Sequence, residues 1–368
     1  MKSIVENALN FPAGSGFFSR KTGLFQLGKW GLVRIIAGLM VLGLGFPSAV
    51  ASAEGPIQAA IALPQDGDLI YIRNLWNLRT RLNKASGGRL ELNPVSRWRA
   101  GGENAILADL LKGQHQLAFT SAATLANTLP AFRLLTLPLL FRDFEEVIAF
   151  AGSPLEQALR ASTPDKELVI LGYASFGFYG ILELAPTENP PDRALTPPWN
   201  GMRVRAPLEP WLRRIHHSLG MRTLELPAQD LPEAMNDGWV QGVASTPELL
   251  ERAGLSATAS RFHTLRILHG WMVLYANRSW LDGLPADLKE LVIRLAEQTC
   301  QESLARAGER ENNLLKAWRA AGHPEPREPE SAWRDQARND LAPLVEPEIE
   351  NLQTVLQNNT LKARWRTP

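Results

Sequence analysis

Cysteine and histidine are scarce in this chain, which limits the chemistry that it can perform. The 368 residues include one cysteine and six histidines, so no intrachain disulfide can form and a structural metal site has few ligands to draw on. The adjacent pair His216 and His217 would point about 100° apart on a helix and could not hold one ion from one face. The sequence therefore predicts neither a metal nor a cofactor.

The motifs of several enzyme classes are also missing. The chain has no G-x-S-x-G elbow, no H-E-x-x-H pair, no P-loop and no G-x-G-x-x-G turn, which mark serine hydrolases, zinc proteases and nucleotide-binding enzymes. The one thiol, Cys300, continues a stripe from Val292 and Ala296 at helical spacing. That spacing predicts a buried and inert side chain, so we expect no catalysis.

A large excess of either charge sign is missing as well. The formal net charge is +1, and residues 1–53 contribute five basic side chains and one acidic side chain to it. The rest of the chain therefore carries a formal charge of −3. A protein without a basic excess is a poor partner for nucleic acid.

What the sequence does have is an N-terminal targeting pattern. Lys29 and Arg34 precede an apolar run, residues 35–46, and Ala51-Ser52-Ala53 follows it with small residues at the positions that a signal peptidase reads. The run is shorter than the ~20 residues that cross a bilayer comfortably. We interpret residues 1–53 as a signal peptide, with an uncleaved anchor as the alternative, and we expect a periplasmic protein.

From residue 54 onward, short apolar runs alternate with amphipathic segments, which is typical of an α/β fold with mixed sheets flanked by helices. Two such blocks predict a two-lobed periplasmic binding protein fold that closes by hinge bending. The expected organisation comprises lobe I at 54–175 with return strands at about 263–284, lobe II at 176–262, one long helix at 285–321, and a C-terminal helical extension at 322–368.

The stretch "WNGMRVRAP" places two arginines on one predicted strand. Met202, Val204 and Ala206 alternate with Arg203 and Arg205, which is the period-two pattern of a strand with one apolar face. Taken alone, this pattern favours two solvated arginines.

The order of motifs in both lobes resembles the extracytoplasmic solute receptors of TRAP (tripartite ATP-independent periplasmic) transporters. In the second lobe, "NGMRVRAP…LGMRTLELPAQDLPEAMNDGWVQGVASTPELL" is similar to the family's Gly-x-Lys-x-Arg strand and the elements after it, with Arg203 in place of Lys. In the first lobe, "GRLELNPVSRWRAGGENAILADLLKGQHQLAFTS" and "LTLPLLFRDFEE" are similar to further family segments. The resemblance covers residues 56–320 and implies that the long helix at 285–321 braces both lobes.

The resemblance implies a role for one of the two arginines. In the family, the arginine of this strand binds the ligand carboxylate, and that role falls to Arg205. A guanidinium group suits it, because its planar pair of donors matches a carboxylate and it keeps its charge when desolvated. Arg203 is expected to remain in water.

Two departures from the family pattern concern the ligand. Tyr179 stands where many members have a second arginine, and Ser245 stands where an asparagine is common. With Phe178, Tyr179 and Trp271 as walls, the site would suit an organic monoacid with an apolar body. The alternative is that Phe178 and Trp271 belong to the core.

Three further residues are candidates for ligand contact. Glu103 follows two glycines at a helix start whose free N–H groups could face an anion, although the glycines could equally form a tight turn. Ser121 ends a strand, where α/β sheets often place ligand contacts, but it could instead cap a helix. Asp230 begins a helix of the second lobe and completes the set.

These features together predict a periplasmic receptor that binds an organic acid between its lobes and delivers it to TRAP membrane subunits. Two other functions stay open: a periplasmic carrier of hydrophobic or lipid-like ligands, and a secreted enzyme on the same fold, because a fold does not fix a function. A ligand-sensing partner of a signalling receptor cannot be separated from the first of these functions by sequence.

Overall fold

The computed structural model describes residues 55–63, 70–95, 102–163, 167–184, 199–206, 209–226, 230–323, 326–330 and 332–367. The expected signal peptide and Gly101 lie outside these residues. Within them, no helix combines the length and the apolar character that a membrane span requires.

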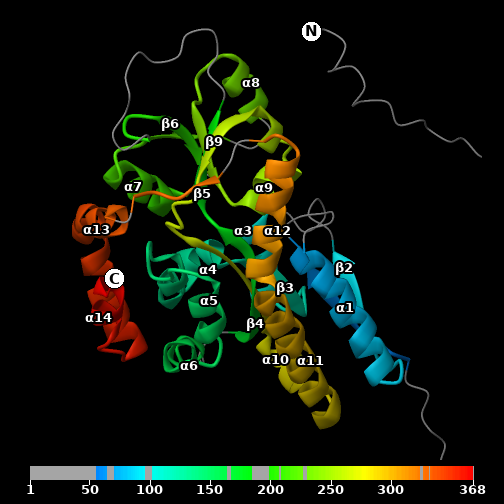
Figure 1. Cartoon of the computed structure of the whole chain (residues 1–368). Coiled ribbons are helices and arrows are strands. Elements are labelled where there is room, and N and C mark those ends of the chain that lie inside the picture. Colours follow the sequence, from blue (N-terminus) through cyan, green and yellow to red (C-terminus); the bar gives the residue numbers. More distant parts are fainter. Residues whose placement is uncertain are drawn as a thin grey trace, which may run out of the picture. The chain divides into compact units, whose positions relative to one another are not determined.

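Lobe I, in the lower half of Figure 1, is built on a five-stranded sheet in the order β2-β1-β3-β10-β4. Strand β1 runs parallel to β2 and β3, whereas β10 runs antiparallel to β3 and β4. The carboxyl ends of β1, β2, β3 and β4 therefore share one edge of the sheet. The strands are β1 (Ile57–Ala62), β2 (Leu90–Val95), β3 (Leu117–Ser121), β4 (Leu168–Phe178) and β10 (His269–Asn277).

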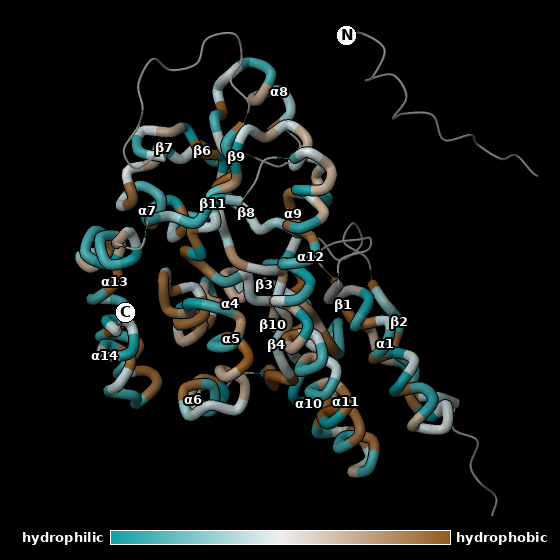
Figure 2. Tube along the Cα trace, in the orientation of Figure 1, coloured by the Kyte–Doolittle hydropathy of each residue, from teal (hydrophilic) through white to brown (hydrophobic). Residues whose placement is uncertain are grey.

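Helices cover both faces of this sheet. Leu75, Leu78 and Leu82 of α1 are buried in one core cluster with the inner side of α11, and α3 to α6 contribute to a second cluster on the other face. Hydrophobic and hydrophilic segments accordingly alternate along α1 and α11 (Figure 2). The helices are α1 (Ile70–Ala85), α3 (Glu103–Leu111), α4 (Ala122–Thr128), η2 (Pro130–Thr136), α5 (Phe144–Phe150), α6 (Pro154–Ala161), α10 (Arg278–Asp282) and α11 (Ala286–Ala305).

Lobe II is built on a second sheet in the order β11-β9-β5-β8-β6-β7. Strands β6, β7 and β8 are parallel, and β5 runs antiparallel to β8 and β9. The two mixed sheets confirm the expected two-lobed α/β fold. The elements are β5 (Gly180–Leu184), β6 (Arg203–Ala206), α7 (Pro210–Ser218), β7 (Arg222–Glu225), α8 (Leu231–Asn236), β8 (Gly242–Ser245), α9 (Pro247–Arg252), η4 (Ser256–Thr258) and β9 (Ala259–His263).

The chain passes between the lobes through β4–β5, through the segment between β9 and β10, and through α11–α12. The lobe boundaries expected at residues 175 and 262 stay a prediction, and β4 runs three residues past the first of them. The single long helix expected at 285–321 is instead two, α11 and α12 (Ala307–Ala320), with Arg306 between them in the right-handed helical region. Cys300 is buried on α11, as its spacing predicted.

Helix α12 supports the β4–β5 crossing through a carboxyl group. The backbone N–H of Phe178 donates to Oε2 of Glu311 over 3.0 Å. Gly177 has a φ of +100°, and a Cβ at this position would lie 2.5 Å from the same oxygen. Only glycine therefore lets the crossing approach Glu311 so closely. Arg310 adds a bond of 3.3 Å from Nη2 to the carbonyl of Ser175.

The C-terminal region is more than the helical extension that the sequence predicted. Its strand β11 (Pro326–Arg327) pairs in parallel with β9 at the edge of the lobe II sheet. Helix α13 (Trp333–Leu356) then contacts η2 of lobe I and α7 of lobe II, and α14 (Leu361–Arg366) packs beside it. Trp365 is fully buried, and its Nε1 donates to the carbonyl of Pro138 over 2.7 Å.

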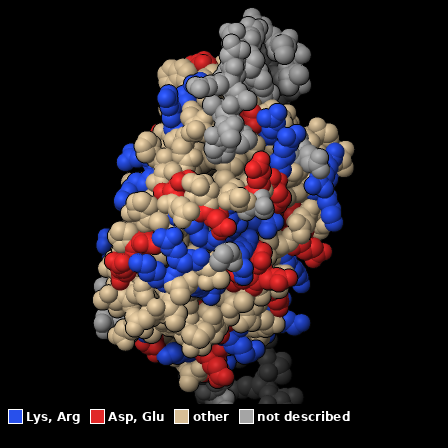
Figure 3. Space-filling model, turned by 60° about the vertical axis from the view of Figure 1, so that its left-hand side comes forward, with Lys and Arg blue, Asp and Glu red and all other residues tan. Residues whose placement is uncertain are grey.

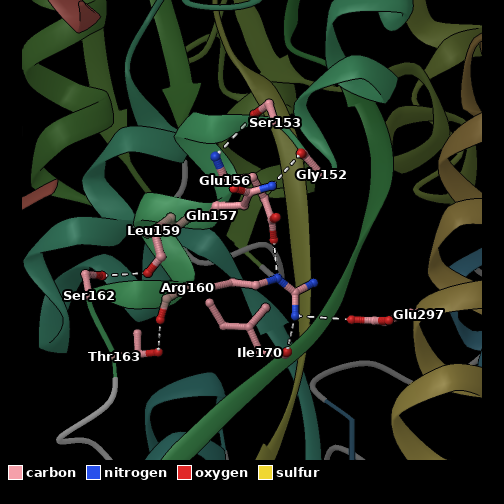
Figure 4. A network of polar contacts seen from close by, with 10 residues as sticks. All are labelled: Gly152, Ser153, Glu156, Gln157, Leu159, Arg160, Ser162, Thr163, Ile170 and Glu297. Atoms are coloured by element: carbon pink, nitrogen blue, oxygen red, sulfur yellow. Dashed lines mark hydrogen bonds and ion pairs between the residues drawn. The ribbon is translucent and has the colours of Figure 1, made fainter. Parts of the chain in front are cut away.

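A buried charge network fixes α6 within lobe I (Figure 4). Arg160 pairs with the buried carboxylate of Glu156, donates to the carbonyl of Ile170 in β4 over 2.6 Å and lies 3.5 Å from Glu297 of α11. Because the guanidinium group supplies donors to three elements, the cost of burying Glu156 is offset by paired contacts.

Replacing Trp365 by alanine is expected to lower the free energy of unfolding by about 3–5 kcal/mol, because a fully buried indole leaves a cavity and Pro138 loses its donor. Urea denaturation measures the change. The control Val355→Ala, at a side chain 41% exposed on α13, should change stability by no more than about 0.5 kcal/mol. Equal effects of the two substitutions would mean that α14 is not part of the folded unit.

Glu311 should make stability depend on pH. Burial raises the pKa of Glu311 to about 7, against the opposing effects of Arg266 and Arg310 and with a further rise from Glu328. Between its ordinary pKa and about pH 7, the folded state keeps a proton that the unfolded state has lost, so this group contributes less stability as pH rises. Above pH 7 both states are ionised, and the full cost of the buried charge is present.

The substitution Glu311→Gln retains an oxygen acceptor for Phe178 and removes the titration. The difference in unfolding free energy between this variant and the unmodified protein should grow by about 1–2 kcal/mol in favour of the variant as the pH rises from 4.5 to 8, with solvent screening allowed for. Denaturation at the two pH values measures the gain. Glu309→Gln, at an exposed position on the same helix, is the control and should show none. A constant difference at both pH values would refute the assignment.

Candidate ligand-binding site

The candidate site in lobe II lies at the carboxyl edge of its parallel strands. Arg205 pairs with Val243 in the register of β6 and β8, and Ser245 ends β8. Gly180 of β5 pairs with Ser245 from the antiparallel side, which brings the preceding residue, Tyr179, to the same edge. Carboxyl ends of parallel strands are where open α/β sheets bind their ligands.

Arg205 carries a positive charge that its surroundings do not neutralise. It is half-buried, and its Nε donates to the carbonyl of Leu226 over 3.1 Å. Among the described residues no carboxylate lies within ion-pair distance of its guanidinium group, and the terminal nitrogens have no hydrogen-bond acceptor. Burial lowers the pKa of Arg205, with Tyr179 opposing that shift. The group is therefore placed to accept an anion.

Tyr179 stands between charges from both lobes. Its backbone N–H donates to the carbonyl of Leu268 over 2.8 Å, which joins two of the crossing segments. The pKa of its phenol is raised to about 12, mainly by burial and also by Glu103 and Glu209, while Arg205 opposes the rise. The phenol is neutral at physiological pH and can donate a hydrogen bond.

Glu103 is held at the facing edge of lobe I, in the first turn of α3. Its Oε2 accepts the backbone N–H of Ser121 over 3.1 Å and the hydroxyl groups of Ser121 and Thr124. Ser121 also caps α4, because its Oγ accepts the N–H of Thr124, so the helix-cap alternative for Ser121 is confirmed. Three donors on one oxygen fix the carboxylate in place and leave Oε1 without a hydrogen bond to the described residues.

An ion pair, which the sequence did not indicate, joins the two lobes. Arg133 of η2 lies 3.9 Å from Glu209, which caps α7 through the N–H of Leu212. Arg133 also stacks over Trp211, whose Nε1 donates to the carbonyl of Thr136 over 2.8 Å. The pair "EP" before a helix identifies Glu209 as a cap, but no local pattern marks Arg133 as its partner.

Two of the expected wall residues belong to the core. Trp271 is 2% exposed and packs against Phe141, Phe150 and Tyr173 inside lobe I. Phe178 is 3% exposed and packs against Phe144. This placement agrees with the alternative that the sequence left open, in which Phe178 and Trp271 belong to the core, because the β4–β10 pair turns them toward the interior of lobe I. Tyr179 is the one aromatic candidate that remains.

The structure places the remaining residues singled out in the sequence, Ser245, Asp230 and Arg203, in three different surroundings. Ser245 lies at the site edge, and its hydroxyl has no partner within the described part of the chain. Asp230 is exposed just before α8, and no hydrogen bond or ion pair between described residues joins it to Arg205 or Tyr179. Arg203 is not simply solvated, since it donates to the carbonyls of Trp239 over 2.9 Å and Gly238 over 2.8 Å.

Arg205 of lobe II and Glu103 of lobe I both act electrostatically on Tyr179, which places these three side chains near one another, and Ser245 lies at the same sheet edge. We call these four residues the inter-lobe site. It offers one unpaired cation, one phenol donor and one fixed carboxylate. Such a set can hold a small molecule that has an acid group at one end and hydrogen-bond donors at the other.

Residues 65–351 match the family described as bacterial extracellular solute-binding protein, family 7, also named DctP. This match spans more than half of the sequence. The chain belongs to this family. Family 7 comprises solute-binding proteins and is not a family of enzymes, and the expected likeness to TRAP solute receptors is confirmed.

Several relatives of this family 7 protein have known sequences or structures. A solute-binding protein of Verminephrobacter eiseniae is 23% identical over 243 residues, covering 66% of this chain and 70% of its own. A TRAP periplasmic solute-binding protein of Roseobacter denitrificans, solved with β-D-glucuronate, has a TM-score of 0.71 at 16% identity, covering 84% of this chain and 99% of its own. A Bordetella pertussis receptor that binds pyroglutamic acid has the same TM-score and identity and covers 84% and 100%. These structures show that the fold is shared.

Proposed function

We propose that this protein is the periplasmic solute receptor of a TRAP transporter and binds a small organic monocarboxylate at the inter-lobe site. The observation that carries the proposal is the half-buried guanidinium group of Arg205, which no described carboxylate neutralises. A ligand carboxylate would receive two parallel N–H bonds from its terminal nitrogens. Family membership and the targeting pattern of residues 1–53 support the periplasmic location.

The body of the ligand is polar in this proposal. An apolar body would need Phe178 and Trp271 as walls, and both are core residues. The site offers instead the phenol of Tyr179 as a donor and the free oxygen of Glu103 as an acceptor. A hydroxy acid satisfies both groups. The ligands of solved relatives, glucuronate, galactonate and pyroglutamic acid, carry hydroxyl or amide groups beside a carboxylate.

Ligand binding would favour the closed form, because Glu103 belongs to lobe I and Arg205 to lobe II. A ligand shifts the balance between open and closed forms only through its different affinity for the two, and simultaneous contact with both residues supplies that difference. The closed form would then be the state that TRAP membrane subunits recognise. No catalytic step is needed for this role.

Replacing Arg205 by alanine should weaken binding of a hydroxy monocarboxylate about 10- to 100-fold, since a hydrogen-bonded charge contributes about 1.5–3 kcal/mol. Calorimetric titration with glucuronate, galactonate and pyroglutamate measures this. Arg205→Lys keeps the charge but loses the planar pair of donors, so its affinity should lie between those of the unmodified protein and the Arg205→Ala variant. Arg222→Ala, at an exposed arginine of the same sheet, is the matched control and should bind normally. Equal affinities of the Arg205→Ala variant and the unmodified protein would contradict the anchor.

Replacing Tyr179 by arginine should change ligand preference from monocarboxylates to dicarboxylates, because it puts a second cation beside Arg205. The ratio of affinities for succinate and glucuronate, from the same titrations, is expected to rise at least about tenfold, the effect of one added charge-assisted bond. The control Tyr179→Phe keeps the ring and removes only the hydroxyl group, so it should weaken glucuronate without improving succinate. An unchanged ratio in the arginine variant would place Tyr179 outside the site.

A further inference from the structure

Four arginines line a cavity that includes none of the four residues of the inter-lobe site. The cavity has a volume of about 260 Å³, many times the roughly 30 Å³ that one water molecule occupies in the liquid. Its arginines come from three segments: Arg142 from the turn before α5, Arg266 from the connection between β9 and β10, and Arg334 and Arg338 from the first turns of α13. Lys and Arg side chains gather in a band across the face that carries α13 and α14 (Figure 3).

The carboxylates near these four guanidinium groups do not neutralise all of them. Arg142 pairs with Glu146, Arg266 lies 3.7 Å from Glu328, and Arg338 lies 3.1 Å from Asp335. Two of these partners, Glu328 and Asp335, also line the cavity, and their side chains are 67% and 64% exposed. The Arg266–Glu328 pair is largely exposed and contributes little. Arg338 is buried and also donates to the carbonyl of Trp365 over 3.0 Å. No described carboxylate lies within 4 Å of the fourth guanidinium group, that of Arg334.

Arg334 is the member of the cluster whose hydrogen bonds are least satisfied. Its Nε is buried without a partner among the described residues, and its Nη2 reaches the carbonyl of Phe141 only over 3.4 Å. The pKa of Arg334 is lowered to about 10, mainly by burial and also by Arg338, Arg266 and Arg142, while Glu146 opposes them. An unpaired buried charge is costly to the folded protein, and a bound anion would remove that cost.

The backbone also holds Arg266 in an unfavourable conformation at this place. Its φ is +48°, a left-handed value that is unfavourable for a non-glycine residue and persists where the surroundings enforce it. The guanidinium group of Arg266 stacks over the ring of Phe178 at 6.0 Å and lines the cavity. The cavity is therefore lined by a cation on each of three segments that are far apart in the sequence.

We propose that this cavity is a second anion-binding site, which takes a small tetrahedral oxyanion such as inorganic phosphate or sulfate. A planar carboxylate has two oxygens and is satisfied by one or two guanidinium groups, whereas a tetrahedral oxyanion offers oxygens in several directions and suits a cluster of them. The half-buried position of Arg334, whose Nε is buried, favours a small free ion, because an acidic protein surface would need the whole cation exposed.

The proposal is tested by titrating inorganic phosphate, and separately sulfate, into the protein in a chloride buffer, with calorimetry and the melting temperature as readouts. The unmodified protein should bind phosphate at millimolar concentration or below and melt at a higher temperature with it. Arg334→Met should weaken binding at least about tenfold, the loss of one charge-assisted contact. Arg222→Met, outside the cluster, should bind phosphate like the unmodified protein.

Two further measurements distinguish anion binding in this cavity from binding at the inter-lobe site and from a general loss of stability. Arg205→Ala should still bind phosphate, so the failure of the inter-lobe proposal and the failure of this one are distinguishable. In phosphate-free buffer, Arg334→Met should melt at the same or a higher temperature than the unmodified protein, because it removes an unpaired buried charge. Absence of phosphate binding, equal binding by Arg334→Met, loss of binding in Arg205→Ala, or a lower melting temperature of Arg334→Met without phosphate would each overturn the proposal.

Discussion

The charge of Arg205 is the feature on which the proposed function depends. Strand β6 places its guanidinium group at the carboxyl edge of the lobe II sheet, where one donor is used by the carbonyl of Leu226 and no described carboxylate pairs with it. A folded protein tolerates a partly desolvated cation only at some cost in stability. A ligand carboxylate would offset that cost, and for this reason the proposed specificity is for acids.

The way in which the lobes are joined determines how that charge could be used. The β4–β5 crossing is held from one side by Glu311 through the N–H of Phe178, and from the other by Leu268 through the N–H of Tyr179. Both bonds fix the backbone at or immediately before a candidate ligand contact. Movement of one lobe against the other therefore has to pass through residues that also position the site, which would link closure to ligand contact.

Much of the fold and part of the candidate site could be predicted from the sequence, and the features that the sequence missed were missed for physical reasons. Alternating apolar runs predicted the two mixed sheets, and the resemblance selected Arg205, because both depend on local order along the chain. The sequence left open whether Trp271 and Phe178 line the site or belong to the core, because an apolar residue near the end of a strand gives no sign of which face it will occupy. Arg133 and the arginine cluster were missed because their partners are distant in sequence, and Arg203 found its carbonyl partners only through the fold.

The central claim is that Arg205 anchors an organic acid, and native mass spectrometry of protein purified from its periplasm without refolding tests it most directly. We expect the unmodified protein to carry a small hydroxy acid, Arg222→Ala to carry the same molecule, and Arg205→Ala to carry none. A ligand of the same mass retained by the Arg205→Ala variant would contradict the claim, because the cation would then have no part in holding it.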